Sequence, residues 1–532
     1  MPSPTLYRVN KIPFTDLIKE NYYLVLDNPE DCRYSILQQD NMLFRQVRII
    51  TSNKEKYNPY VLFVDCKGQK NKVGELTEVI LNGFYFNGKR FVLSERSASM
   101  SRNSILSFVE NSIAAKLNER ITMGMKIDKT VLSKYLAYRG LMFSSCFCLE
   151  NWFPKVIVVD DYEKIIPDQD IKFLQDETID FVDKNGQQRT WVQKTVTRGT
   201  KDIVLNAFDG CGLHHPSLTK QVKEIIGYEH EPTTILWRAP TIKGVTHQFD
   251  YTTYLSERGV EWIEDLWHVR HSVYEPMIIL TKSMYKGYKY FYEDGTARDW
   301  ENYWAQFHRY NHCLGVAKVN FSQEQEPAYT TGNYQILQDL DLEYEDFKQL
   351  ANISMDYVEK VIQGDPAYTY HFLGLMADKH DGLNNYMRAI LKNPEMMREA
   401  GVRKYVMGLL HKKLDEMKCG KFYLDATFKF LAPDLIMLVQ HIGGLPREGV
   451  LESNEFWSKS KYKEYSGEYL IERNPHLDFS EHIILSQNKS DEMAKWCGHL
   501  DNVCIINSKS ITNSRLNGAD WRVKNKSCFT VM

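Results

Sequence analysis

The period of the apolar residues changes twice along the chain, and this change most constrains the fold. Residues 196–300 contain short β-type runs, 301–420 follow a helical repeat near 3.6, and strand-like runs return over 421–521. Residues 1–195 mix both patterns, and 522–532 continue neither. We therefore expect an α+β protein: a mixed α/β N-terminal region, a strand-rich domain, a helical connector, a second strand-rich domain and an aberrant tail.

Three local patterns make sharper predictions. Asn87-Gly88 between apolar runs predicts a hairpin over 84–93, since this pair tolerates the positive φ of a tight turn. Apolar residues at helical spacing predict a helix over 105–117. The run 434–439, Asp-Leu-Ile-Met-Leu-Val, predicts a buried strand.

Size and charge limit the classes of protein that remain. At about 150 residues per domain, 532 residues correspond to three or four domains. Lys and Arg (66) nearly balance Asp and Glu (69), so a polyanion would have to be held by a local basic cleft. The N-terminus lacks a signal-peptide pattern, and no run approaches about 18 apolar residues, which predicts a cytoplasmic protein without a membrane partner. Ten cysteines without a CxxC pair favour reduced thiols.

Two clusters of residues could form a metal site or a catalytic site, but each has a simpler structural explanation. His308 and His312 are spaced for zinc, yet Arg309 stands where a HExxH motif has its glutamate, so a structural role is favoured. Asp160-Asp161 end an apolar strand, where catalytic carboxylates are often found and where polar strand ends are also ordinary.

A third cluster points toward nucleic acid. The segment 281–290 interleaves lysines, Lys282 and Lys286 among them, with three tyrosines and contains no acid. This mixture can follow a phosphate backbone and offer rings for base stacking. Residues 456–463 repeat it. The alternative for both segments is an exposed loop.

The most specific signal lies near the end of the chain. Glu472-Arg-Asn-Pro-His-Leu477 is followed about forty residues later by Asn517-Gly-Ala-Asp-Trp521. In order and spacing these resemble the R-x-P-x-L and N-[AG]-A-D-F-D-G-D elements of RNA polymerases built on two double-psi β-barrels.

Upstream segments resemble the single-chain branch of that group, the RNA-dependent RNA polymerases of RNA silencing and their phage relatives. The matching segments, in order, are Ser97–Arg102, Lys134–Ser145, Phe208-Asp-Gly-Cys-Gly-Leu213, Trp237-Arg-Ala-Pro-Thr-Ile-Lys-Gly-Val245 and Leu424–Asp434. Thr241 stands where the branch usually has glycine. The likeness runs from about residue 80 to 521.

The resemblance implies a fold and a chemistry. The fold would be two double-psi β-barrels, the second incomplete, joined by a helical connector. Asp520 would bind catalytic Mg²⁺, and Lys243, with Arg238 nearby, would meet the phosphate charge of the transition state. Arg473 would contact the incoming nucleotide or the template–product hybrid. The partners implied are a nucleic-acid template, an RNA product and nucleoside triphosphates.

One departure from the pattern limits this prediction. After Asp520-Trp521 the motif requires Asp-Gly-Asp, but the chain reads Arg522-Val-Lys524. A lone carboxylate cannot hold two Mg²⁺ ions against their hydration. We therefore expect no polymerase activity from this chain alone, an unclosed second barrel, and a separate segment that supplies the rest. The alternatives are a non-catalytic nucleic-acid-binding scaffold and an unrelated interaction protein, and the choice between DNA and RNA templates stays open.

Overall fold

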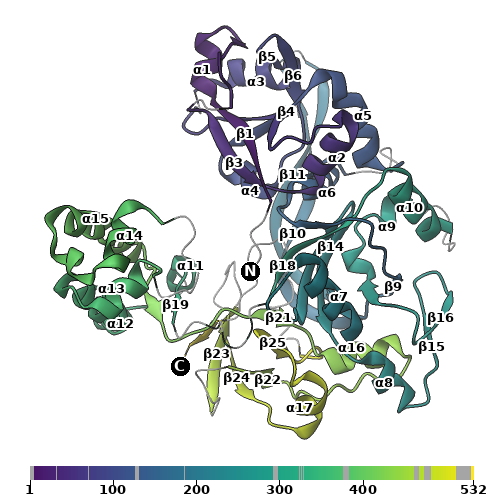
Figure 1. Cartoon of the computed structure of the whole chain (residues 1–532). Helices are drawn as coiled ribbons and strands as arrows, with labels where there is room; N and C mark the ends of the chain where they lie inside the picture. The colour runs from purple at the N-terminus through teal and green to yellow at the C-terminus, as the bar shows by residue number, and fades with distance from the viewer. Residues whose placement is uncertain are drawn as a thin grey trace.

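The fold is a mixed α+β arrangement of an N-terminal domain, two curled sheets packed together, a helical lobe and a long β-ribbon (Figure 1). The computed structural model describes residues 5–30, 33–69, 71–125, 131–184, 186–291, 298–320, 322, 324, 326, 329–338, 340–375, 383–460, 467–472, 481–510 and 529–531. No helix among these residues is long and apolar enough to cross a membrane.

The N-terminal domain is one sheet with a core on each face. The strands lie in the order β2-β5-β6-β7-β4-β1-β3. Along β4, Val61 and Phe63 enter one core and Leu62 and Val64 the other, because successive strand residues point to opposite faces. The elements are β1 (Leu6–Pro13), α1 (Phe14–Lys19), β2 (Tyr23–Leu24), β3 (Ser35–Gln39), α2 (Met42–Thr51), β4 (Tyr57–Asp65), α3 (Val73–Asn82), β5 (Phe84–Phe86), β6 (Lys89–Leu93), α4 (Ala98–Arg102), β7 (Ile105–Glu110), α5 (Asn111–Thr122) and α6 (Leu132–Arg139).

Two of the local predictions are tested in this domain. The hairpin around Asn87-Gly88 is confirmed, with both residues at positive φ between β5 and β6. The helix over 105–117 is wrong in its first half, since Ile105–Glu110 forms β7 and the helix α5 begins at Asn111. β7 is a central strand paired with β4 and β6, so tertiary pairing overrides the helical spacing.

The first curled sheet has the strand order β8-β18-β13-β14-β12-β17-β9 and mixes parallel with antiparallel pairs. Its strands come from 147–319, a wider span than the 196–300 expected from the sequence. The strands are β8 (Phe147–Leu149), β9 (Val156–Val159), β12 (Cys211–His214), β13 (Thr234–Ala239), β14 (Ile242–Gln248), β17 (Ile278–Thr281) and β18 (Leu314–Val319). Helices α7 (Pro216–Ile226), α8 (Tyr251–Ser256), α9 (Tyr288–Phe291) and α10 (Arg298–Arg309) accompany them, with a small hairpin of β15 (Trp262–Glu264) and β16 (Arg270–Ser272).

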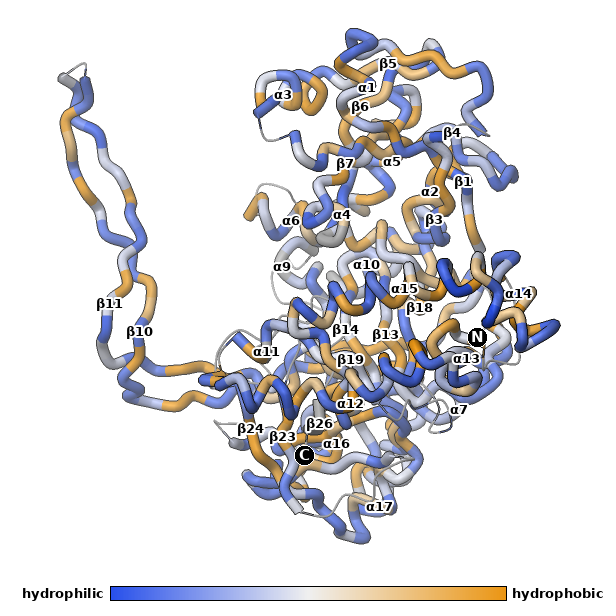
Figure 2. The backbone as a smooth tube through the Cα atoms, turned by 90° about the vertical axis from the view of Figure 1, so that its left-hand side faces the viewer, coloured by the Kyte–Doolittle hydropathy of each residue, from blue (hydrophilic) through white to orange (hydrophobic). Residues whose placement is uncertain are grey.

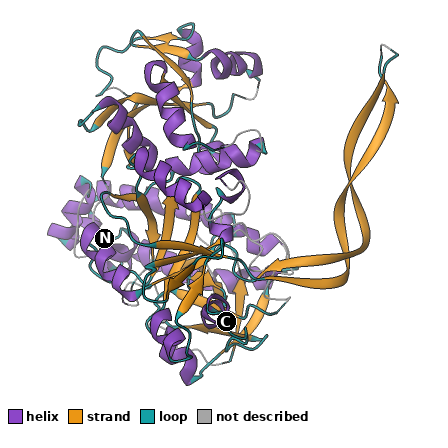
Figure 3. Ribbon diagram, turned by 90° about the vertical axis from the view of Figure 1, so that its right-hand side faces the viewer, coloured by secondary structure: helices purple, strands orange, loops and turns teal. Residues whose placement is uncertain are grey.

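The ribbon leaves this sheet as an arm of two long antiparallel strands, β10 (Glu163–Val182) and β11 (Gln188–Asn206) (Figures 2 and 3). Ile166 is the one buried residue of the two strands. Three basic residues of β11 each pair with an aspartate at 2.6 or 2.7 Å: Arg189 with Asp183, Lys194 with Asp176 and Arg198 with Asp170.

The second curled sheet has the order β21-β25-β22-β24-β23-β26. It comprises β21 (Phe430–Ala432), β22 (Glu455–Ser458), β23 (Glu468–Glu472), β24 (Ile483–Gln487), β25 (Val503–Ile506) and β26 (Phe529–Val531), with helices α16 (Leu435–Ile442) and α17 (Asp491–Cys497). The strand predicted over 434–439 is wrong, because this run forms α16 with Asp434 as its N-cap. One hydrophobic core, including Ile279 and Leu255 of the first sheet's region and Leu438 and Ile505 of the second, joins the two.

The helical lobe lies to one side of both sheets (Figure 1). It has its own core, in which Val358 and Val361 meet Val402, Val406 and Leu410. It contains α12 (Tyr344–Gln363), α13 (Pro366–Phe372), α14 (Asn385–Lys392) and α15 (Ala400–Lys418), and is approached through β19 (Thr330–Thr331), α11 (Tyr334–Gln338) and β20 (Tyr423–Leu424). Gly420, at φ 78°, follows α15, as its place in the sequence suggests.

Candidate functional site

Two basic residues of the segment Trp237–Val245, Arg238 and Lys243, face each other on the β13–β14 hairpin. Arg238 is paired with Lys243 in the antiparallel register, and directly opposed residues lie on the same face of a sheet. Both side chains are buried, with Arg238 at 0% and Lys243 at 8% exposure. Two cationic side chains on one buried face of a hairpin can together bind an anion.

Arg238 uses only part of its hydrogen-bonding capacity. Its Nη1 donates to the carbonyl oxygen of Trp237 at 2.7 Å. Within the described part of the chain, Nε and Nη2 are buried and have no hydrogen-bond partner. Burial lowers the pKa of the guanidinium from 12.5 to about 10, with the neighbouring Cys146 thiol acting in the opposite direction. The side chain therefore stays charged at neutral pH with unused donors, as an anion-binding group would.

A short segment, 281–286, which we name the strap, holds the hairpin from beside it. The backbone N–H of Lys286 donates to the Thr241 oxygen at 2.7 Å, and Ile242 and Tyr285 form a β-bridge. Met284 packs so closely against Gly244 that a Cβ there would collide with its side chain, and one at Gly212 would collide with the Ile279 backbone. The two motif glycines are thus required because strap and strands approach without room for side chains.

Thr241 forms the hairpin turn in a strained backbone conformation. Its φ is 58°, in the left-handed region that is a genuine outlier for a β-branched residue. This is the position where the resembling family usually has glycine, which adopts such a φ without strain.

Thr241→Gly is accordingly expected to raise the free energy of unfolding by up to about 1 kcal/mol, because relief of left-handed strain outweighs the added freedom of the unfolded chain. Urea denaturation at pH 7 would measure it. Thr241→Ala is the matched variant and should fall between the two, since it removes the branch but keeps a Cβ. A Gly variant less stable than wild type would show that the turn is unstrained.

Lys282 and Lys286, which the sequence predicts to contact nucleic acid, both lie in the strap. Lys282 Nζ pairs with Asp160 at 3.1 Å, and Lys286 is half-buried beside the hairpin turn. The base-stacking role suggested for the tyrosines is wrong for Tyr285 and Tyr290, since both rings are buried in the core of the first sheet's domain. These two tyrosines therefore serve packing, and Lys286 lies at the turn of the hairpin that carries Arg238 and Lys243.

The other predicted site residues, Asp520 and Arg473, lie outside the described residues. Glu472, directly before Arg473, is fully buried at the end of β23, and burial raises its pKa to about 8. Its Oε1 lies 2.5 Å from Nδ1 of His482. Nothing in the sequence marks this pair, because the burial of an acidic residue beside a motif arginine leaves no sequence signal.

The zinc interpretation of His308 and His312 is not supported. The ring nitrogens of His312 lie 3.0 Å from Gln46 Nε2 and from the Arg120 oxygen, so the imidazole joins the N-terminal domain to the first sheet. Burial lowers its pKa to about 3. Among the residues with described positions, no group of three or more His, Cys, Asp or Glu could hold a metal ion, so the structure tests no magnesium site.

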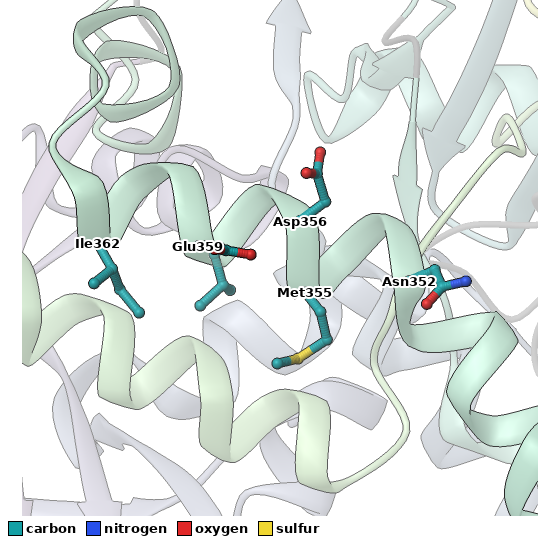
Figure 4. Close-up of a pocket in the computed structure, with 6 residues that line it drawn as sticks. Asn352, Met355, Asp356, Glu359 and Ile362 are labelled. Carbon is teal, nitrogen blue, oxygen red and sulfur yellow. The ribbon is translucent and has the colours of Figure 1, made fainter.

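A separate pocket of about 590 Å³ lies on α12 of the helical lobe (Figure 4). It is lined by Asn352, Met355, Asp356, Val358, Glu359 and Ile362. All of these come from one helix, and Asp356 pairs with Lys360 at 3.4 Å. This pocket contains none of the motif residues.

Known polymerases resemble this chain in sequence and in fold. No protein-family profile matches the chain. The DNA-directed RNA polymerase YonO of Bacillus phage SPbeta is 25% identical over 434 residues, which cover 79% of this chain and 46% of YonO. Among solved structures, the RNA-dependent RNA polymerase QDE-1 from Thielavia terrestris matches with a TM-score of 0.58 at 11% identity, over 100% of this chain and 53% of that one.

The chain thus spans about half the length of the polymerases it matches. The sequence match and the structural match point to the same group of proteins, as the motifs suggested. The chain is a distant homologue of the phage RNA polymerase YonO and has a fold similar to about half of QDE-1.

Proposed function

We propose that this chain is the phosphate-binding part of a template-directed RNA polymerase, which adds nucleoside monophosphates to an RNA 3′ end. The observation that carries the proposal is the buried Arg238–Lys243 pair, on the motif shared with the resembling polymerases. In this proposal the two curled sheets are double-psi β-barrels, and the second is completed by a separate segment.

The two cations would have distinct roles. Lys243, a compact ammonium group, would meet the triphosphate charge that develops during nucleotidyl transfer. Arg238, with two unused donors, would fix the orientation of phosphate oxygens. Lys282 and Lys286 would contact the template or product backbone, and Arg473 would contact the incoming nucleotide or the template–product hybrid. Magnesium would be held by Asp520 together with carboxylates of the separate segment, because one carboxylate is too few.

The test is nucleotide incorporation on matched DNA and RNA templates with Mg²⁺. We expect no product from this chain alone, and product when a segment carrying Asp-Gly-Asp and the closing strands is added. Lys243→Met should then lower the incorporation rate by about 10²- to 10³-fold, as expected for loss of one transition-state contact. Incorporation that is unaffected by Lys243→Met would contradict the role of the pair.

The alternative is a non-catalytic nucleic-acid-binding scaffold, favoured by Arg522-Val-Lys524 in place of the metal-binding acids. A scaffold would bind template with a steep dependence on salt and give no product even with the added segment. Filter binding over a salt series, run beside the incorporation assay, distinguishes the two functions.

A further inference from the structure

Asp160-Asp161 meet two motif-bearing segments at the base of the arm. They follow β9 directly, and β10 begins two residues later. The other strand of the arm, β11, ends at Asn206, just before Asp209-Gly210-Cys211-Gly212. The strap reaches the same place after β17, which is paired with β9. Three segments far apart in sequence therefore converge here.

Ser283 of the strap connects the other two segments. Its hydroxyl accepts the backbone N–H of Gly210 at 2.9 Å and donates to Oδ1 of Asp161 at 3.0 Å. Thr281 at the start of the strap donates to the Cys211 oxygen at 3.0 Å. One end of the strap is thus tied to Asp161 and the Gly210 segment, and the other end to the turn of the Lys243 hairpin.

We propose that Asp161 and Ser283 are positioning residues, which hold Lys243 in register for a polyphosphate through the strap. The inference rests on the proposed function and adds residues that do not touch the ligand. Met284 of the strap lies against Gly244 and Gly212, so a shift of the strap changes the contacts beside Lys243. A loss at Ser283 is therefore transmitted to the residue next to Lys243.

The charge around Asp161 makes this arrangement dependent on pH. Asp160 and Asp209 oppose its ionisation, Lys282 is paired with Asp160, and His441 donates to the Asp160 oxygen at 3.0 Å. Arg447 lies over the ring of the adjacent Tyr162. Burial, the largest cause, raises the pKa of Asp161 to about 6, while the Ser283 and Asn206 hydrogen bonds lower it.

Ionised Asp161 accepts the Ser283 hydroxyl strongly, and the protonated acid does so weakly. The folded pKa lies above that of an ordinary aspartate, so the proton is taken up as pH falls through about 6. Alignment of Lys243 should therefore be complete at pH 7.5 and reduced at pH 5.5.

Calorimetric titration of the full chain with inorganic tripolyphosphate tests the inference, with Lys243→Met giving the background at each pH. We expect the Lys243-dependent Kd of wild type to weaken about threefold from pH 7.5 to 5.5, because a group with a pKa of about 6 is mostly but not fully protonated at pH 5.5. Asp161→Asn and Ser283→Ala should be about tenfold weaker at pH 7.5 and nearly independent of pH. Ser283→Thr, which retains a hydroxyl, should restore both affinity and pH profile.

Ser458→Ala is the matched control, because it removes a comparable buried hydroxyl bond, 2.7 Å long, in the second sheet. It should keep the wild-type profile. If Asp161→Asn and Ser283→Ala bind like this control, the positioning role is wrong and the proposed function stands. If wild type and Lys243→Met bind tripolyphosphate equally at both pH values, the proposed function fails, and the inference with it.

Discussion

Arg238→Met is expected to raise the free energy of unfolding by about 3–4 kcal/mol while weakening tripolyphosphate binding at least tenfold. The folded pKa of about 10 against 12.5 means that the charged form is disfavoured by burial, and each pKa unit corresponds to about 1.4 kcal/mol. Because the folded value is lowered, the penalty is present at full size at pH 7. Methionine removes the charge at similar length, and such replacements of buried charges are often stabilising.

Urea denaturation and calorimetric titration on the same preparation measure the two effects. Arg198→Met on the arm is the control, since its guanidinium is mostly exposed and should change stability by less than about 0.5 kcal/mol. If Arg238→Met destabilised the chain, the guanidinium would have a stabilising partner in the free protein. The opposite signs expected for stability and binding are the mark of a residue kept for a ligand.

The parts of the fold that follow from local sequence were predictable. Asn87-Gly88 specifies its hairpin, and the stripe Ser354, Val358 and Val361 specifies α12. In both cases the local signal, a turn-forming pair or an apolar stripe on one side, agrees with the surroundings that these residues have in the fold. The motif Trp237–Val245 likewise singled out Arg238 and Lys243, which the fold brings together on one hairpin.

The two incorrect secondary-structure predictions also have physical reasons. The run after Asp434 is buried on all sides, and an apolar run buried all round reads equally as strand or helix. The available signal was Asp434 itself, whose side chain accepts the N–H groups of Ile436 and Met437 as an N-cap. In β7 the pairing partners lie in distant strands, so local spacing misled the prediction.

Burial at the site was not predictable from the motifs. Arg238 is enclosed partly by β18, which pairs with β13 from about 80 residues further along the chain, and by Cys146 from the other direction. Tyr285 and Tyr290 looked suited to stacking on bases because their neighbours are lysines, and the core that buries them is built from separate segments. The sequence therefore identified the candidate side chains, and only the fold showed which of them are exposed.

Acidification from pH 7 to pH 5 is expected to cost about 4 kcal/mol of unfolding free energy through two buried imidazoles. His247 and His312 are both fully buried, and burial is the largest cause that lowers the pKa of each to about 3. The unfolded chain takes up a proton near pH 6.5 and the folded chain does not. Stability is therefore complete above pH 6.5 and falls towards pH 3, by about 2 kcal/mol per histidine at pH 5.

His214, whose pKa burial also lowers, adds to the loss. Urea denaturation at half-unit pH steps measures the slope, which should approach about 1.4 kcal/mol per pH unit for each group. The double variant His247→Gln and His312→Gln should flatten the curve by two protons. An unchanged slope in the double variant would mean that both imidazoles are protonated in the folded chain. Because His312 contacts the N-terminal domain and His247 lies on β14, the acid loss should weaken domain docking and the Lys243 hairpin together.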